Sequence, residues 1–134
     1  MIDMKDNYEE ALEKMDFEFF ANANHKISPD SFLKKENAVF LDVRTQEEVN
    51  AVSFNLKNHC EVLHIPLHEL STRIDEIPKD KFIGLFCSGT QRASIAFGYL
   101  RGKGYDNTKI ILATIEKMAE EIKPGKIKKS MRMF

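Results

Sequence analysis

The segment 82–94 constrains the fold of this chain most strongly, because an apolar run leads through a cysteine into a helix. Residues 82–86 are nearly continuous apolar sequence, which is typical of a strand buried on both faces. Cys87 follows, and Arg92 stands at the predicted start of a helix after four intervening residues. Backbone N–H groups gather at a helix N-terminus and stabilise an anion there. The segment predicts a strand–loop–helix unit whose loop holds a reactive thiol, suited to sulfur or to phosphate chemistry.

Predicted strands and helices alternate along the whole chain. Short apolar runs predict strands at 38–41, 62–65, 82–86 and 110–112. Apolar spacing and capping residues predict helices at 6–19, 29–33, 46–52, 68–74, 92–101 and 115–122. Such alternation is typical of the α/β class, so we expect a mainly parallel central sheet flanked by helices on both sides.

Two of the predicted helices have clear start signals. Ser28 stands before Pro29, and proline suits the first position of a helix. Thr45 and Glu48 have the spacing of a capping box, in which each side chain binds the backbone N–H group of the other residue. We therefore expect these helices to begin at residues 29 and 46.

The composition is that of one globular domain. The chain has 134 residues, of which 43% are hydrophobic, and a formal net charge of −1, which allows one apolar core. No apolar run approaches the roughly 20 residues that a membrane span needs, and the acidic start lacks the apolar stretch of a secretion signal. With two cysteines and no such signal, we expect a reduced, cytoplasmic protein without a membrane partner.

The two ends of the chain carry opposite charge. Residues 1–20 hold seven acids and two lysines, a net of −5, and residues 123–134 hold five basic residues and no acid, a net of +5. We expect an amphipathic helical extension at 1–22, a folded domain at 23–124 and a basic tail at 125–134. The extension packs on the domain, forms a dimer or meets a partner protein. The tail is solvated, attracts the acidic end or binds an acidic partner. We do not expect nucleic acid there, because the tail has one aromatic residue, Phe134.

The order of motifs in the expected domain resembles that of the single-domain rhodaneses, over residues 25–124. The resemblance rests on Asp42, Val43 and Arg44, on His64, Ile65 and Pro66, on the loop 87–92 and on the stretch 102–106. It implies the rhodanese-like α/β fold, with no metal ion and no organic cofactor. Three stretches depart from the family's pattern. Residues 54–61 replace a Gly-His-Ile-x-Gly-Ala segment, Gly89 comes two rather than three residues after the cysteine, and residues 113–115 replace a common Gly-Gly-Ile turn.

The resemblance implies a sulfurtransferase that uses Cys87 as its catalytic nucleophile. In the family, the thiolate takes the outer sulfur of a donor such as thiosulfate, becomes a persulfide, and gives this sulfur to a thiol- or cyanide-type acceptor. The loop that binds the anion then consists of Ser88, Gly89, Thr90, Gln91 and Arg92. Apart from the resemblance, the N–H groups of residues 88–92 suit a thiolate or persulfide anion.

The charged residues near this loop have alternative roles. Arg92 binds an anionic donor, or forms an ion pair that holds the loop. We expect Asp42 to support the structure rather than to transfer protons, by accepting backbone N–H bonds or by pairing with Arg92 or Arg44. Arg44 either binds the donor or lies at the surface.

Other functions stay open on the sequence alone. The domain is alternatively a sulfur-relay or regulatory module that carries persulfide between partner proteins, or a scaffold in which Cys87 has no role. The same fold includes phosphatases and arsenate reductases, but these have five residues between cysteine and arginine, whereas four make a tighter loop. Cys60 is a candidate resolving thiol for Cys87. His59, Cys60 and His64 match no standard zinc spacing.

Overall fold

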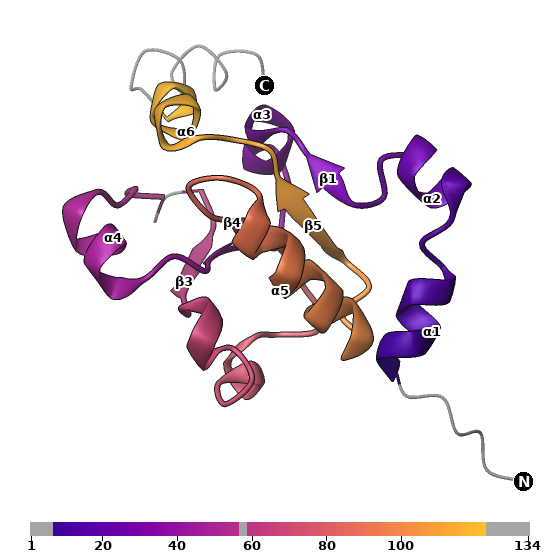
Figure 1. Ribbon diagram of the computed structural model, residues 1–134. Coiled ribbons are helices and arrows are strands. Elements are labelled where there is room, and N and C mark those ends of the chain that lie inside the picture. Colours follow the sequence, from indigo (N-terminus) through magenta and orange to yellow (C-terminus); the bar gives the residue numbers. More distant parts are fainter. Residues whose placement is uncertain (1–6, 57–58, 123–134) are drawn as a thin grey trace, which may run out of the picture.

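The core of the protein is a five-stranded sheet in which each neighbouring pair of strands is parallel (Figure 1). The computed structural model describes residues 7–56 and 59–122. Across the sheet the strands follow the order β1-β5-β4-β2-β3. They comprise β1 Lys26–Ile27, β2 Ala38–Asp42, β3 Glu61–His64, β4 Phe82–Phe86 and β5 Thr108–Ile111. The predicted α/β class with a parallel sheet is confirmed.

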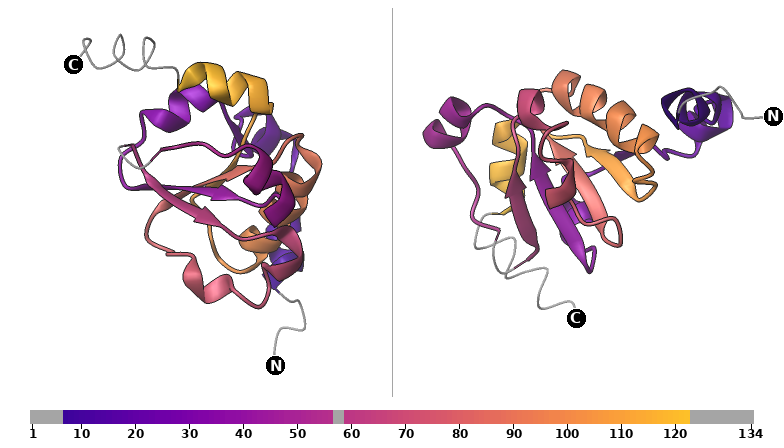
Figure 2. Two further views of the ribbon diagram at one scale, coloured as in Figure 1. Left: turned by 90° about the vertical axis from the view of Figure 1, so that its left-hand side faces the viewer. Right: turned by 90° about the horizontal axis from the view of Figure 1, so that it is seen from below.

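Helices cover both faces of this sheet. Helix α5 and two 3-10 turns pack on one face, and α3 and α6 pack on the other. Figure 2 shows α3 and α6 lying side by side. The helices comprise α1 Asn7–Glu13, α2 Phe17–Ala21, α3 Pro29–Leu33, α4 Gln46–Ala51, α5 Gln91–Gly102 and α6 Ile115–Glu121, and the 3-10 turns are η1 Leu67–Glu69 and η2 Ile74–Glu76.

Two apolar clusters fill the space between the sheet and its helices. All five residues of β2 are buried, because this strand lies between two others and is covered on both faces. Deeply buried members include Val39, Leu41, Leu85, Ala96 and Leu100 on the α5 face, and Phe32, Phe40, Phe86, Ile111 and Met118 on the other face. The site described below is thus built on the most buried strands of the molecule.

The two predicted helix starts are confirmed. The Ser28 hydroxyl accepts the Ser31 N–H at 3.2 Å, ahead of Pro29 at the first position of α3. At α4, the Thr45 hydroxyl accepts the Glu48 N–H at 3.3 Å, while the Glu48 carboxylate accepts the Thr45 N–H at 3.2 Å. The capping box therefore fixes both the start of α4 and the direction of the Glu48 side chain.

The prediction of one helix over 6–19 is wrong, because two short helices occupy this region. They separate at Asp16, whose carboxylate accepts the Phe19 N–H at 3.0 Å and caps α2. A short polar side chain that bonds to the nearby backbone offers the chain an alternative to a continuous helix. The apolar spacing that predicted one helix is thus divided between α1 and α2.

The prediction of a helix at 68–74 is also wrong. The chain forms the turns η1 and η2 instead, and the Thr72 hydroxyl donates to the Glu69 carbonyl at 3.0 Å, a bond that competes with helical pairing. Strand β1 was not predicted, because it has only two residues. Backbone pairing holds it beside β5, where the Ile110 N–H donates to the His25 carbonyl at 2.8 Å.

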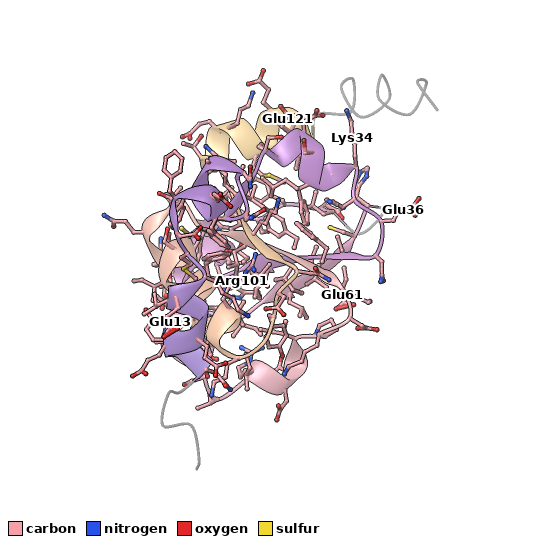
Figure 3. All side chains as sticks on the ribbon, turned by 90° about the vertical axis from the view of Figure 1, so that its right-hand side faces the viewer. Glu13, Lys34, Glu36, Glu61, Arg101 and Glu121 are labelled. Atoms are coloured by element: carbon pink, nitrogen blue, oxygen red, sulfur yellow. The ribbon has the colours of Figure 1, made fainter. Side chains whose placement is uncertain are left out.

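The N-terminal helices pack on the folded domain. In Figure 1, α1 lies beside the C-terminal half of α5. A Cβ added to Gly102 of α5 would lie 3.1 Å from the Tyr8 Cα, so glycine allows the two helices to approach. Arg101, labelled in Figure 3, lies over the Phe19 ring at 5.4 Å from its centroid and donates to the Thr108 carbonyl at 3.1 Å. This side chain therefore joins α2 to β5.

Among residues 7–56 and 59–122 there is no helix with the length and apolar character needed to span a membrane. The predicted basic tail at 125–134 lies outside the described residues.

Gly84 in the middle of β4 is expected to be essential for stability. An added Cβ would collide with the ring of Phe32 and lie 2.9 Å from the Ile111 side chain, both of which are buried. We expect Gly84→Ala to lower the free energy of unfolding, measured in urea, by about 1–3 kcal/mol, as overpacking of a core does.

The matched control is Gly98→Ala in α5, where the added Cβ would lie 3.4 Å from the Tyr8 ring. It should leave stability unchanged or raise it by up to about 1 kcal/mol, because alanine favours helix. Equal effects of the two substitutions would contradict the packing argument.

Candidate active site

Cys87 and Asp42 lie at the same edge of the sheet, where parallel strands end. Strand β4 ends at Phe86, which pairs with Asp42 at the end of β2. The Val43 N–H then donates to the Phe86 carbonyl at 3.0 Å, so the segments that follow β2 and β4 remain paired as far as Cys87. In Figure 1 the loop between β4 and α5 lies between α4 and α6. Open parallel sheets bind their ligands at this edge.

The Cys87 thiol is almost completely enclosed by its own loop. The residue is 1% exposed, its S–H group donates to the Gly89 carbonyl at 2.6 Å, and the Ala93 N–H donates to its sulfur at 3.4 Å. The sequence predicted donors among residues 88–92, whereas this donor lies one residue further on, in the first turn of α5. The remaining loop residues Gly89, Thr90 and Gln91 are exposed.

An ion pair closes this loop against α4. The Arg92 guanidinium donates to the two carboxylate oxygens of Glu48 at 2.6 and 2.9 Å, and it also donates to the Ser88 hydroxyl at 3.0 Å. These hydrogen bonds from Arg92 hold the pKa of Glu48 at about 2, against an ordinary value of 4.5, and the pKa of Arg92 is raised in turn. Of the two alternatives for Arg92, the geometry supports the ion pair that holds the loop.

Glu48 is a site residue that the sequence analysis missed. The same carboxylate completes the capping box with Thr45 and binds Arg92, 44 residues further along the chain. Its spacing from Thr45 was the available signal, and that signal indicated only a local role. The start of α4 and the loop around Cys87 are thus held by one side chain.

A second ion pair is buried beneath the loop. The Arg44 side chain is fully buried and donates to both Asp42 oxygens, with contacts of 2.7 to 3.1 Å, and the Arg44 backbone N–H donates to the same carboxylate at 3.0 Å. The guanidinium also lies over the rings of Phe54 and Phe86, at 5.6 and 5.4 Å. The pairing of Asp42 with Arg44 agrees with one of the expected alternatives. The expectation that Arg44 lies at the surface is wrong, because its side chain is fully buried, and donor binding by Arg44 stays a prediction.

Two hydrogen bonds to backbone carbonyls fix the segment that holds this pair. The Ile65 N–H donates to the Asp42 carbonyl at 3.0 Å, and the His64 ring nitrogen Nε2 lies 2.7 Å from the Arg44 carbonyl, to which it donates in the matching tautomer. Residues 42–44 are therefore fixed from the side of β3 as well as from β4.

Cys60 lies too far from Cys87 to act as its resolving thiol. Glu61 pairs with Val39 near the start of β2, whereas Cys87 follows Phe86, the partner of Asp42 at its end. Cys60 precedes Glu61 and is level with residue 38, whereas Cys87 is level with residue 43, and five residues of strand span about 16 Å, well beyond disulfide reach. Burial raises the pKa of Cys60 to about 11, so little thiolate forms at neutral pH. In residues 7–56 and 59–122, moreover, no three His, Cys, Asp or Glu side chains are grouped to hold a metal ion.

The chain is similar to several known proteins. The chain is 33% identical over 75 residues to a tRNA sulfurtransferase of Aeromonas hydrophila subsp. hydrophila, a match that covers 56% of this chain and 15% of that protein. No family model matches the chain. The chain spans only about 15% of the length of the curated relatives that it matches.

Two solved structures show similar arrangements of strands and helices. An NAD-dependent persulfide reductase from A. fulgidus is 31% identical, with a TM-score of 0.56 over 75% of this chain and 17% of its own. A rhodanese-related protein from Thermoplasma volcanium is 22% identical, with a TM-score of 0.62 over 75% of this chain and 95% of its own. The second comparison matches the fold over nearly the whole of the other protein.

Removing one partner of the buried ion pair should be strongly destabilising. Asp42→Ala leaves the Arg44 charge enclosed without its partner, and we expect a loss of about 3–5 kcal/mol in the free energy of unfolding. The double variant Asp42→Leu/Arg44→Met buries no charge and should lose much less. Urea unfolding of both proteins measures the difference, and a single variant at least as stable as the double variant would contradict this account.

The Glu48–Arg92 pair should stabilise the fold in a pH-dependent way. Because folding depresses the pKa of Glu48 from 4.5 to about 2, the stabilisation is fully present above the unfolded value and is lost as the pH falls through the folded value. The difference in unfolding free energy between the unmodified protein and Glu48→Gln should be constant above about pH 5 and decrease below it.

The matched control is Glu47→Gln, one residue earlier on α4 and exposed to solvent. It should differ less from the unmodified protein at neutral pH. A difference for Glu48→Gln that does not change between pH 7 and pH 2 would show that the pair contributes nothing.

Proposed function

We propose that this chain, whose fold is that of the rhodanese-like domains, is a sulfurtransferase that carries sulfane sulfur on Cys87. The observation that carries the proposal is the position of this thiol. It lies at the carboxyl end of β4, within a four-residue loop that the Arg92–Glu48 pair closes. The similarity to a tRNA sulfurtransferase and to a persulfide reductase supports the same chemistry.

In the first step, the Cys87 thiolate attacks the outer sulfur of a donor such as thiosulfate. A sulfur–sulfur bond forms to Cys87, the sulfur–sulfur bond of the donor breaks, and sulfite leaves with the electron pair. The product is a persulfide on Cys87. No external oxidant or reductant takes part, because the transferred atom is sulfane sulfur both in the donor and in the persulfide.

In the second step, an acceptor thiolate or cyanide attacks the outer sulfur of the persulfide. The bond between this atom and Cys87 Sγ breaks, and Cys87 leaves as a thiolate that is ready for another donor. The acceptor becomes a persulfide or thiocyanate. The enzyme thus returns to its starting state after each cycle.

The loop supplies favourable interactions to the anionic forms of sulfur. The Ala93 N–H already points at the sulfur atom, and the 12-residue helix α5 adds the partial positive charge of its N-terminus. When the thiol ionises it loses its bond to the Gly89 carbonyl, because a thiolate has no proton to donate. The anion then depends on the N–H donors of the loop and of α5.

The arrangement of Arg92 argues against phosphate chemistry. Its guanidinium is already bound to both oxygens of Glu48, which neutralises the charge that a phosphate dianion needs. The loop also has four residues between cysteine and arginine rather than five. We expect no Cys87-dependent hydrolysis of phosphate esters.

A second candidate function is sulfur relay between proteins. Two larger proteins that the chain resembles are named as a tRNA sulfurtransferase and as an NAD-dependent persulfide reductase, and neither name refers to thiosulfate. In this case Cys87 receives its sulfur from a protein persulfide and turns over thiosulfate slowly. Both candidates use the same persulfide, so they differ in donor and acceptor alone.

Mass spectrometry after exposure to thiosulfate tests the proposed function. We expect one added sulfur atom on Cys87, none in Cys87→Ser, and an unchanged adduct in Cys60→Ala. The last variant is the matched control, because Cys60 is the other cysteine of the chain and lies at the opposite end of the sheet. Absence of an adduct with thiosulfate and with a protein persulfide would overturn the proposal.

The rates with the two donors separate the two candidates. Thiosulfate–cyanide turnover that exceeds transfer from a protein persulfide favours the first function, and the reverse order favours relay.

A further inference from the structure

A groove lies beside the Cys87 loop, on the side that faces α6. It is a shallow and open groove with a volume of about 380 Å³. One wall comes from the loop, and the other comes from the turn between β5 and α6 together with the first residues of that helix. The lining residues are Gly89, Thr90, Leu112, Ala113, Thr114 and Lys117.

Gly89 lies between the groove and the Cys87 sulfur. The carbonyl of this residue accepts a hydrogen bond from the Cys87 thiol at 2.6 Å, and the same residue lines the groove. A Cβ added to Gly89 would meet no heavy atom within 4 Å, so open space adjoins the loop at this point. A molecule in the groove is therefore separated from the thiol by a single residue.

The walls suit a small ligand with an apolar part and a negative charge. Leu112 is 41% exposed, and Ala113 and Gly89 add no polar side chain. Lys117 is the one charged residue among the six that line the groove. Its side chain is 52% exposed and pairs with Glu121 at 3.4 Å, which occupies one of its three ammonium protons.

We propose that this groove binds the sulfur acceptor, and that the acceptor is a small thiol with a carboxylate group that Lys117 binds. The inference rests on the proposed function and adds to it the acceptor's site and charge. The thiolate of the bound acceptor attacks the outer sulfur of the Cys87 persulfide. A new sulfur–sulfur bond forms on the acceptor, the bond to Cys87 Sγ breaks, and Cys87 keeps the electron pair as a thiolate.

Three thiols of similar size and different charge test the proposal. The protein is loaded to the Cys87 persulfide, and its loss is followed by mass spectrometry with 3-mercaptopropionate, 2-mercaptoethanol or cysteamine. Rates are expressed per thiolate, which removes the differences in acidity among the thiols. We expect the anionic thiol to react fastest, and Lys117→Glu to lower its advantage over the neutral thiol about fivefold, the upper value for one exposed ion pair.

Lys34→Glu is the matched control. Lys34 lies at the end of α3, which packs beside α6, and is labelled in Figure 3 together with Glu121. Its side chain is 53% exposed and pairs with Asp30 four residues earlier at 3.3 Å, so it matches Lys117 in exposure and in the spacing of its ion pair, although Asp30 is exposed and Glu121 is buried. It does not line the groove, so its substitution should leave the ratio of rates unchanged.

The outcomes distinguish the groove from the proposed function. Unmodified protein that forms no persulfide overturns the proposed function itself. Loaded protein whose ratio of rates is the same in Lys117→Glu and Lys34→Glu overturns the groove alone. Lys117→Gln serves if Lys117→Glu does not fold, and it should lower the ratio in the same direction by a smaller factor.

Discussion

The buried pair of Asp42 and Arg44 is the interaction on which the rest of the site depends. Both side chains are enclosed at the point where β2 ends, and the aspartate binds the backbone as well as the guanidinium of its partner. Two charges in such a place require close mutual bonding, because neither can be solvated. The pair therefore fixes the course of residues 42–44. This segment in turn binds the Phe86 carbonyl, the last backbone acceptor before Cys87.

Glu48 carries this order outward to the loop. Its carboxylate caps α4 and also binds Arg92, so the helix after β2 and the helix after β4 meet at one side chain. The sequence predicted the first bond because a capping box is local and has a fixed spacing. The second bond joins residues 44 apart and exists only once the two strands lie side by side. Spacing along the chain contains no sign of such a contact.

The same distinction explains which parts of the fold were predicted. Strands β2 and β4 and helix α5 follow from continuous apolar runs and from caps, which act within a few residues. The break at Asp16 and the turns around Thr72 depend on side-chain bonds to the backbone that compete with helix, and apolar spacing does not record them. The two-residue strand β1 exists because β5 offers it a partner. Burial of Arg44 was missed because a charged residue is normally exposed unless it is paired.

Gly89 connects the two halves of the proposed reaction. When Cys87 is a thiol, the Gly89 carbonyl accepts a hydrogen bond from its S–H group. This orientation of the peptide stabilises the thiol and does not stabilise a thiolate. Ionisation or sulfur loading removes that proton and leaves a carbonyl oxygen facing negative charge, which is unfavourable in this arrangement of the peptide. No heavy atom would lie within 4 Å of a Cβ at this position, so a shift of residue 89 toward the groove meets open space. In the proposed cycle, Gly89 is thus the single residue that lies between the persulfide and the proposed acceptor groove.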